Sequence, residues 1–443
     1  MPERSKPHLV YIAFFFPPSR ASGVYRALAT ANAFHEKGWE VTVITSDEEF
    51  YINEIGTYDS SLLTGIDQGI SVIRVPFSFG VNRGNRNDGR FKSVFFRVQR
   101  KAKVVFSKIF GRLFSAVKAD NYFKWIDPAV SALLEVNKSK RVSHILATGN
   151  PFSSFEVAYR CHKTIKVPFS IDYRDPWTLD VYSGEKLPLD KRVYALEKRI
   201  VESASNIFHV NEEMSEKNKA MFPKSVSNQF VAPNGFDLDS VASYRRNADD
   251  EALVFGILGT LNPHWPIKEI LLAWNNITRD LPQGSCIKLG GYLGYFAHSE
   301  KPLSKLLPVG STSFQYVGPI KKGEIKAFYE SLDAIIIPAS GGPMVTTGKV
   351  YEVAAQPHPV VCIQGKDGGA RMALIGRPHV HSCEAEISAI EQAMRNAINS
   401  HFDINQNDIL EIQEFAASFE RRVSLETLVR HVQASTNDGD LDG

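Results

Sequence analysis

Residues 333–364, DAIIIPASGGPMVTTGKVYEVAAQPHPVVCIQ, contain the pattern that decides how the chain is expected to fold. The apolar run at 334–337 is typical of a buried parallel strand, and a loop rich in small residues follows it. A helix is predicted to begin near 347–349 and to end before Pro357, which cannot continue it. Residues 360–363 form the next apolar run. Strand, loop, helix and strand in this order predict one unit of a parallel α/β sheet.

The loop and the helix start in this stretch offer the groups that a phosphate ligand needs. A glycine-rich loop leading into a helix N-terminus presents free backbone N–H groups and the positive end of the helix dipole. Lys349 adds a positive charge, and Glu352, one turn later, can accept hydrogen bonds from a ribose. The alternative is an ordinary strand-loop-helix-strand unit in which Lys349 and Glu352 form a solvated pair.

The segment GKVYEVAA at 348–355, followed by the strand that starts Pro-Val-Val at 359–361, carries a resemblance to a known family. It resembles the donor-binding segment of retaining glycosyltransferases of the GT-B fold, in particular the family-4-type (group 1) enzymes. The resemblance implies two Rossmann-like lobes facing each other across a cleft. It also implies transfer of a hexosyl-type sugar from a nucleotide-sugar donor, with retention of configuration at the anomeric carbon.

The resemblance assigns roles to individual donor-site residues. It implies that Glu352 holds the nucleotide ribose and that Thr347, Gly348 and Lys349 hold the diphosphate. The family pattern has another glutamate eight positions before the ribose-binding one, near the transferred sugar. Met344 occupies that position here, so the contacts to the sugar ring differ from the family pattern.

The composition is that of a globular protein with two or three domains. The chain has 443 residues, of which 43% are hydrophobic and 23% charged, and its net charge of +2 gives no signal for a nucleic-acid partner. Four cysteines show no paired spacing, which favours free thiols in a reducing compartment. The N-terminus lacks an apolar signal core, and no stretch approaches the ~20 apolar residues that span a bilayer. We therefore expect a cytoplasmic protein.

The first half of the chain alternates short apolar runs with segments of helical spacing, as in a doubly wound sheet. Predicted strands lie at 9–16, 41–45, 71–76, 144–147, 167–172 and 207–210, and predicted helices at 24–37, 125–136, 153–162 and 189–204. The first strand-helix turn lacks the GxGxxG fingerprint, so NAD binding is not supported. By the resemblance, Gly23 in this turn approaches the donor phosphates; otherwise it simply begins a helix.

Polar residues follow two of these predicted strands. Asn150 comes after the strand at 144–147, while Arg174 and Asp175 come after the strand at 167–172. Because the carboxyl ends of parallel strands line the ligand crevice, these three are candidate acceptor-side residues. The alternative for Arg174 and Asp175 is a local ion pair that closes a loop bounded by proline.

A basic segment interrupts the first half. No acidic residue occurs from 90 to 118, where nine Lys and Arg residues are interleaved with six phenylalanines. Apolar residues recur there at three- and four-residue steps, which predicts an amphipathic helix. Basic helices with an aromatic face lie on anionic membrane surfaces, and we favour this interpretation. A helix packed on its own domain and a nucleic-acid patch are the alternatives.

The second half begins another strand at 254–258 and a helix at 267–277. In the resembled family an arginine and a lysine in this region clamp the diphosphate. Thr260 stands in place of the arginine, which removes a bidentate phosphate partner, and Lys268 lies in about the place of the lysine. Lys268 is otherwise a solvent-facing helix residue. By the resemblance, Gly290 and Gly291 lie near the nucleotide base.

These observations predict three parts of the chain. Residues 1–240 form an acceptor-side lobe with the basic insertion at about 90–118, and 251–415 form the nucleotide-sugar donor lobe. Residues 416–443 hold the end of a helix predicted at 411–434, which crosses back to the first lobe, and a tail.

The resemblance also implies the chemistry and the partners. Lys268 and Lys349 are the candidates for stabilising the leaving diphosphate, and Asp175 is the third catalytic candidate. The nucleotide sugar is a co-substrate, and no metal or other cofactor is required. The acceptor is expected to be a glycan or, as the basic segment at about 90–118 suggests, a lipid-linked precursor of surface polysaccharide. That segment would place the protein peripherally at the cytoplasmic face of the inner membrane.

Other functions on the same fold stay open. One is a nucleotide-sugar epimerase or a phosphorylase with two similar lobes. Another is a protein that binds nucleotide sugars without catalysis, which Met344 and Thr260 make plausible because both depart from the family pattern.

Overall fold

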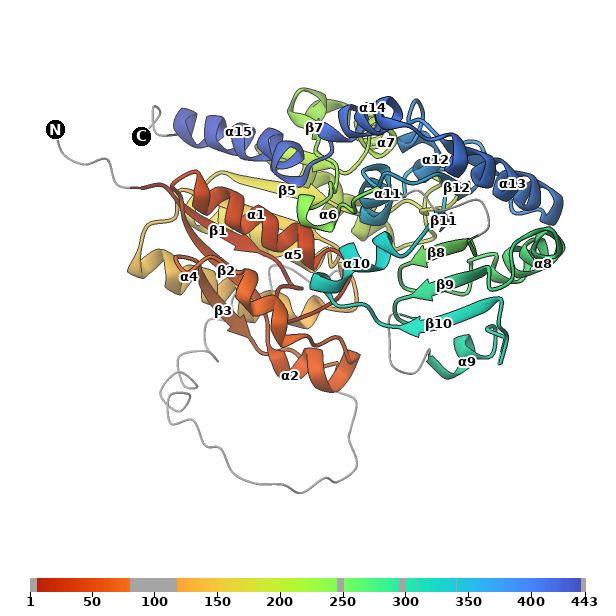
Figure 1. Cartoon of the computed structure of the whole chain (residues 1–443). Coiled ribbons are helices and arrows are strands. Elements are labelled where there is room, and N and C mark those ends of the chain that lie inside the picture. The colour runs from red at the N-terminus through yellow and green to blue at the C-terminus, as the bar shows by residue number, and fades with distance from the viewer. Residues whose placement is uncertain are drawn as a thin grey trace, which may run out of the picture.

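Two α/β lobes, each built on one parallel sheet, make up the part of the chain that the computed structural model describes (Figure 1). The described residues are 6–79, 118–244, 251–294, 300–308, 310–339 and 341–439. The sheets have the strand orders β3-β2-β1-β4-β5-β6-β7 and β10-β9-β8-β11-β12-β13. Both are doubly wound, because the order reverses at β1/β4 in one and at β8/β11 in the other. The α/β class and the two Rossmann-like lobes predicted from the sequence are confirmed.

The N-terminal lobe contains seven strands and the helices that cover them. The strands are β1 (His8–Ile12), β2 (Glu40–Ser46), β3 (Ser71–Val75), β4 (His144–Gly149), β5 (Phe169–Tyr173), β6 (Asn206–His209) and β7 (Gln229–Val231). The helices are α1 (Val24–Glu36), α2 (Glu48–Phe50), α4 (Ile126–Ser139), α5 (Ser153–Ile165), α6 (Lys191–Ser203) and α7 (Glu212–Met221). The basic helix predicted at 90–118 lies outside the described residues, apart from Lys118.

The C-terminal lobe follows the same strand-helix alternation. Its strands are β8 (Val254–Leu258), β9 (Cys286–Gly290), β10 (Phe314–Gly318), β11 (Ala334–Pro338), β12 (Val360–Ile363) and β13 (Val380–Cys383). Its helices are α8 (Ile267–Ile277), α9 (Glu300–Ser304), α10 (Ile325–Glu330), α11 (Gly348–Ala354), α12 (Gly369–Ala373), α13 (Ile387–Asp403) and α14 (Gln406–Ala417), and α15 (Arg421–Gly439) ends the described chain.

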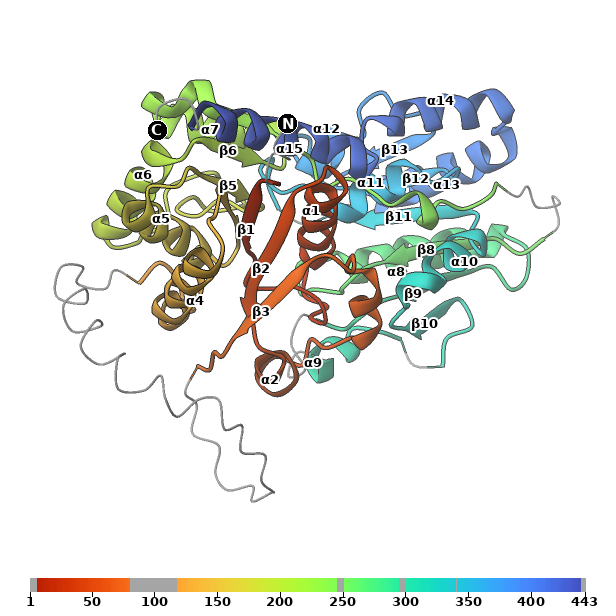
Figure 2. The ribbon, with the colours of Figure 1, turned by 90° about the vertical axis from the view of Figure 1, so that its left-hand side faces the viewer.

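The two lobes face each other with the ligand-binding edges of their sheets. In Figure 1 the arrows of β9 and β10 end on the side that faces the N-terminal lobe. The last helix, α15, returns to the N-terminal lobe, where Leu425, Leu428 and Val432 pack in one apolar cluster with Ala27 of α1 (Figure 2). Because α15 belongs to the end of the chain but packs on its first lobe, it holds the two lobes together.

The single helix predicted at 411–434 is wrong, because the chain breaks into α14 and α15 between them. The backbone at the break bonds to another segment instead of continuing the helix. Phe236 N donates to Phe419 O at 3.0 Å, and Arg421 N donates to Phe236 O at 2.8 Å. The paired residues are 183 to 185 positions apart in the chain, so no local pattern in the sequence predicts this pairing.

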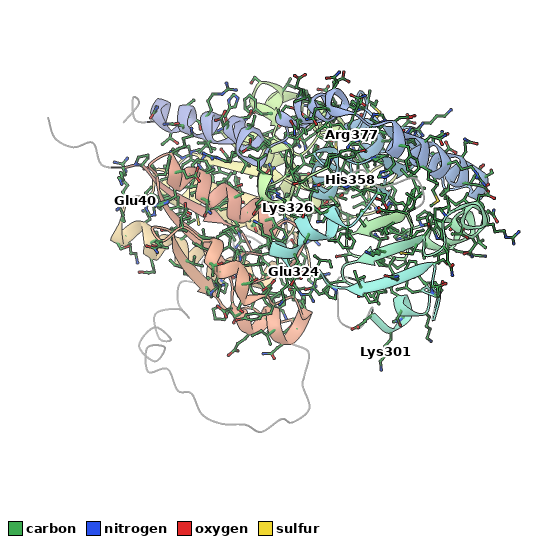
Figure 3. The ribbon with its side chains drawn as sticks, viewed as in Figure 1. Glu40, Lys301, Glu324, Lys326, His358 and Arg377 are labelled. Atoms are coloured by element: carbon green, nitrogen blue, oxygen red, sulfur yellow. The ribbon has the colours of Figure 1, made fainter. Side chains whose placement is uncertain are left out.

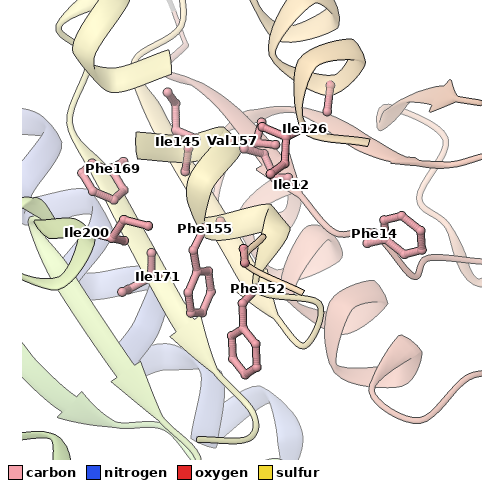
Figure 4. Packing of buried hydrophobic residues seen from close by; sticks show 14 of the residues in the cluster. Ile12, Phe14, Ile126, Ile145, Phe152, Phe155, Val157, Phe169, Ile171 and Ile200 are labelled. Atoms are coloured by element: carbon pink, nitrogen blue, oxygen red, sulfur yellow. The ribbon is translucent and has the colours of Figure 1, made fainter. Parts of the chain in front are cut away.

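Continuous apolar runs in the central strands produce a core that is buried on both faces of the first sheet. Figure 4 shows Ile145 of β4 and Ile171 of β5 packed with Phe155 of α5 and Ile200 of α6. The strand predicted at 9–16 ends earlier, at Ile12, and Phe14 and Phe15, which follow it, join an aromatic cluster that includes Tyr122. Burial of these side chains is the main stabilising term of the lobe.

A fully buried arginine organises the end of α11. Arg377 donates to four backbone carbonyls, those of Ala354 (2.9 Å), Gln356 (2.5 Å), His358 (3.0 Å) and Pro378 (2.7 Å). Figure 3 labels Arg377 and His358 close together in the C-terminal lobe. Burial lowers the pKa of Arg377 to about 9, so the side chain stays charged at neutral pH. Arg377 thus satisfies the last carbonyl of α11, that of Ala354, and two carbonyls of the turn that follows the helix.

A buried ion pair joins α1 to β5 in the N-terminal lobe. Arg26 donates from Nε to Asp172 Oδ2 at 3.0 Å and from Nη2 to Oδ1 at 2.7 Å, in the bidentate geometry that makes such pairs strong. Its Nη1 donates to Pro233 O at 2.8 Å, and Thr148 Oγ1 donates to Asp172 Oδ2 at 3.1 Å. Each partner is almost inaccessible to solvent, so neither charge can be left alone without a large cost.

We predict that Asp172→Asn lowers the free energy of unfolding by ~3–5 kcal/mol, because Arg26 would keep a buried charge without its partner. Urea denaturation followed by circular dichroism measures the change. The matched control is Asp190→Asn, whose carboxylate pairs with Arg192 at the surface and should matter little. Equal stability of the two variants would contradict the role given to the buried pair.

A buried acid in the same lobe predicts a pH dependence. Burial raises the pKa of Glu197 from 4.5 to about 7, although the Thr178 and Tyr173 hydroxyls donate to it and lower it. Between these values the folded protein holds a proton that the unfolded chain has released. Stability therefore falls as the pH rises from about 4.5 to about 7, and the loss amounts to ~3 kcal/mol.

Glu197→Gln removes this titration and keeps the size of the side chain. We expect the variant to gain melting temperature relative to the wild type as the pH rises from 5 to 8. Thermal unfolding at a series of pH values measures the difference. Parallel profiles for the two proteins would mean that Glu197 does not titrate in this range.

Candidate functional site

The stretch that opened the sequence analysis folds as predicted and lies between the lobes. β11 is followed by a loop, and α11 begins at Gly348 with Thr347 as its N-cap residue. The Thr347 side chain is exposed and makes no cap hydrogen bond. Thr346, one residue earlier, is buried and carries the contacts to the other lobe. The loop thus presents Thr347 and Gly348 outward while Thr346 anchors it.

Glu352 is held in place through one of its two carboxylate oxygens. Its Oε1 accepts from Tyr329 Oη at 2.8 Å and from Lys349 Nζ at 2.6 Å. No hydrogen bond from the described residues reaches Oε2. The glutamate side chain is 15% exposed, so this second oxygen can meet a ligand while the first fixes its direction.

The first turn of α1 in the N-terminal lobe lies close to Asn234, because Arg26 in that turn donates from Nη1 to Pro233 O at 2.8 Å. Burial, followed by the negative charges of Asp59 and Glu352, raises the pKa of Tyr25 to about 12. The Cβ of Asn234, also from the N-terminal lobe, lies 3.9 Å from the position that a Cβ on Gly348 would occupy. The start of α11 and the start of α1 therefore form opposite walls of one region, which we call the seam.

Three of the predicted N-terminal residues meet at the seam. Arg174 donates from Nε to Gly149 O at 3.1 Å, from Nη1 to Ser22 O at 3.0 Å, and from Nη2 to Asn150 O. Gly23 has a φ of +87°, and a Cβ on it would lie 1.3 Å from Arg174 Nη1. Only glycine fits there, because the guanidinium occupies the space of a side chain.

Asp175 lies beside this group and is half-buried. Its carboxylate makes no hydrogen bond or ion pair with the described residues. Burial raises the pKa of Asp175 above its ordinary value, and the charge of Arg174 opposes that rise. The local ion pair between Arg174 and Asp175, the alternative to an acceptor-side role, is not formed within ion-pair distance, so both polar groups remain available to a ligand.

Side-chain amides of the N-terminal lobe fasten the loop before α11. Asn211 Nδ2 donates to Thr346 Oγ1 at 2.9 Å, and Asn234 Nδ2 donates to Thr346 O at 3.0 Å. Gly342 N donates to Val181 O at 3.2 Å. Nothing in the sequence indicates this role of Asn211, whose only local signal is that of an N-cap residue for α7.

The other predicted donor-side residues are spread around the seam. Gly291 packs on Gly259, where a Cβ would lie 1.8 Å from Gly259 O, and Gly290 is buried under Ile320. Thr260 is half-buried in the loop after β8.

Lys268 and Met344 are placed quite differently from each other. Lys268 is exposed on α8 and forms no ion pair with the described residues. Met344 is buried, and its terminal methyl lies 3.6 Å from the position of a Cβ on Gly184 in the N-terminal lobe. Met344 therefore packs between the lobes. The roles that the sequence gave to these two residues stay predictions.

A contact that the sequence analysis missed crosses the seam. The Arg20 guanidinium, in the loop after β1, lies 3.6 Å from the centre of the Tyr292 ring in the C-terminal lobe. Arg20 also donates to Gly56 O at 2.7 Å. A cation over an aromatic face is attracted to it, so this pair adds to the contacts between the lobes.

Other features of the described residues bear on ligands. No group of three or more His, Cys, Asp or Glu side chains among them could hold a metal ion. None of the described helices is long and apolar enough to cross a membrane. An open hollow of about 600 Å³ lies between β13 and α13, and none of the predicted site residues lines it. Its lining includes Lys366, Arg371, His381 and Asn396.

Comparison with solved structures identifies the fold, whereas no family model and no curated protein sequence matches the chain. Sucrose-phosphate synthase from Thermosynechococcus elongatus is similar over 97% of this chain and 100% of its own, with a TM-score of 0.63 and 13% identity. HepE from Anabaena in complex with UDP-glucose is similar over 97% and 99%, with a TM-score of 0.62 and 13% identity. The fold is therefore GT-B, as the sequence predicted.

A protein of another activity shares this fold. A putative UDP-N-acetylglucosamine 2-epimerase from Listeria monocytogenes is similar over 98% of each chain, with a TM-score of 0.57 and 11% identity. Because one fold supports several functions, the choice among them depends on the seam itself.

We predict that Gly23→Ala destabilises the protein more than Gly38→Ala does. Both glycines have a positive φ, +87° and +84°, so backbone strain should lower the free energy of unfolding of both variants by ~1–2 kcal/mol. Nothing lies within 4 Å of a Cβ on Gly38, whereas a Cβ on Gly23 must displace Arg174 from its three carbonyls. Urea denaturation should show a further loss of ~1–3 kcal/mol for Gly23→Ala. Equal losses would contradict the contact between Gly23 and Arg174.

Proposed function

We propose that this protein is a glycosyltransferase that moves a sugar from a nucleotide-sugar donor to an acceptor hydroxyl. The observation that carries the proposal is the Glu352 carboxylate, fixed by Tyr329 and Lys349 through one oxygen and open through the other, at the seam of two GT-B lobes. The two hydroxyl groups of a ribose can donate hydrogen bonds to such an oxygen. The structural neighbours that bind UDP-glucose and UDP support a nucleotide ligand.

The proposed reaction exchanges one bond at the anomeric carbon for another. The acceptor oxygen forms a bond to that carbon, and the bond from the carbon to the diphosphate oxygen breaks. The diphosphate leaves with the electron pair, and Thr347, Gly348, Lys349 and Lys268 would stabilise its charge. The acceptor proton goes to the leaving phosphate or to Asp175, whose half-buried carboxylate lies at the end of β5.

The finer features of the proposal rest on the family resemblance. They are transfer of a hexosyl group, retention at the anomeric carbon, and a glycan or lipid-linked acceptor in the assembly of surface polysaccharide. The basic segment at about 90–118 supports attachment to an anionic membrane surface, at the cytoplasmic face of the inner membrane. Asn150, which is exposed beside Arg174, is the proposed contact to the acceptor. The nucleotide sugar serves as a co-substrate, and the proposed step uses no metal.

The second candidate function is a nucleotide-sugar epimerase, which the fold of the Listeria protein favours. An epimerase changes the donor when no acceptor is present, whereas a transferase needs the acceptor hydroxyl. Incubation with the donor alone, followed by analysis of the sugar product, therefore separates the two. A new sugar epimer on the nucleotide would favour the epimerase.

We predict that Glu352→Gln weakens nucleotide binding by ~10- to 100-fold, because hydrogen bonds to a charged group contribute about 1.5–3 kcal/mol. The measurement is calorimetric titration of UDP, GDP, dTDP and ADP and of one sugar conjugate of each. Glu414→Gln, at an exposed position of α14, is the matched control and should bind as the wild type does. Equal affinity of the two variants would place the nucleotide elsewhere, and binding of none of the ligands would contradict the proposed function.

A further inference from the structure

The lysines of the C-terminal lobe that could meet a phosphate ligand are not equally available. The Lys349 ammonium forms an ion pair with Glu352 at 2.6 Å, and the Lys322 ammonium forms one with Asp237 at 3.2 Å. Lys268 is exposed and unfixed, while Thr260 carries no charge. A nucleoside diphosphate brings at least two negative charges, and these described residues of the C-terminal lobe do not offer an ordered, unpaired cation for each of them.

Two guanidinium groups of the N-terminal lobe are ordered at the seam without an ion pair among the described residues. Arg20 lies over the Tyr292 ring, whereas Arg174 is held by backbone carbonyls next to Gly23. A guanidinium has five N–H groups, and three of them donate to the carbonyls of Gly149, Ser22 and Asn150. Two N–H groups are left over. Carbonyl oxygens fix the direction of the side chain without cancelling its charge, and no carboxylate of the described residues forms an ion pair with it. Such a group is preorganised for an anion.

The position of Arg174 limits what that anion can be. The guanidinium lies against Gly23, directly before the first turn of α1. Arg26 in that turn donates to Pro233 O at 2.8 Å, and Gly348 lies opposite Asn234, the next residue of the same lobe. The anion that reaches Arg174 is thus within the space that the proposed donor occupies. Arginine is also the side chain that matches phosphate oxygens with two parallel hydrogen bonds.

We infer that Arg174 binds the diphosphate of the nucleotide-sugar donor across the seam, so that the N-terminal lobe supplies part of the phosphate site. The inference rests on the proposed function and differs from the acceptor-side role that the sequence predicted for this residue. It makes Arg174 a ligand-binding residue that acts on the phosphates and not on the nucleoside.

The test compares a nucleoside diphosphate with its own nucleoside. The proteins are the wild type, Arg174→Met, Arg174→Lys and the control Arg192→Met, which removes an exposed arginine from the same lobe. The diphosphate is whichever of UDP, GDP, dTDP and ADP the wild type binds best. We expect Arg174→Met to weaken binding of the diphosphate by ~10- to 100-fold and binding of the nucleoside by less than twofold. The effect of Arg174→Lys on diphosphate binding should be intermediate. Affinity of the wild type should fall with added salt more steeply than that of Arg174→Met.

A control for folding and the contrary outcomes complete the experiment. Melting temperatures show whether each variant is folded, and Gly23→Ala, which displaces the guanidinium without removing its charge, should lose diphosphate affinity in the same selective way. Diphosphate affinity of Arg174→Met within twofold of the wild type, or an equal loss for diphosphate and nucleoside, overturns the inference. If Glu352→Gln still weakens nucleotide binding in that case, the proposed function is retained and only the inference about Arg174 is rejected. No nucleotide binding by the wild type overturns both.

Discussion

The buried pair of Arg26 and Asp172 sets the geometry on which the N-terminal half of the seam depends. Arg26 lies in the first turn of α1, and Asp172 lies one residue before the end of β5. The bidentate contact fixes the helix start relative to the strand end. Gly23 precedes the helix and Arg174 follows the strand, so the same contact brings these two together. A change in the pair would therefore reach the site even though neither partner is exposed to a ligand.

The C-terminal half of the seam depends on the N-terminal lobe as well. The loop before α11 is fixed by amide groups of Asn211 and Asn234, which reach it from the other lobe. Arg421 at the start of α15 donates to Asp237 at 2.6 Å and to Asn234 O at 2.6 Å, next to the same place. Motion of the lobes would therefore change the loop and the distance between Glu352 and α1 together. Such coupling is how a two-lobed protein can close around a ligand and exclude water.

Much of the fold could be predicted from the sequence, because local patterns of apolar residues determine most of its strands and helices. Apolar runs at 334–337 and 360–363 became β11 and β12, and the helix predicted after Thr347 became α11. The division between α14 and α15 could not be predicted, since it is caused by pairing with Phe236, far away in the chain. A local pattern records what a segment prefers, and a distant segment can overrule that preference.

Contacts between distant segments are even harder to predict at the site. Glu352 and Lys349 are three positions apart on one helix, and their contact follows from helical spacing alone. The contact of Gly23 with Arg174 spans 151 positions and needs the whole sheet to be assembled. Residue type gave a hint in each case, glycine in a tight turn and arginine after a strand, but the partner of each could not be read from the chain. Tyr329, which holds Glu352, gave no signal that its hydroxyl would meet a carboxylate.

Hydrogen–deuterium exchange of the whole protein, with and without a nucleotide sugar, shows whether the two lobes share one nucleotide-sugar site. A ligand bound at the seam lies between the start of α11 and the start of α1. We therefore expect slower exchange at 341–355 and also at 17–25 and 172–176, with no change around the hollow between β13 and α13. Slower exchange confined to that hollow, or to one lobe alone, would contradict the claim that the two lobes share one nucleotide-sugar site.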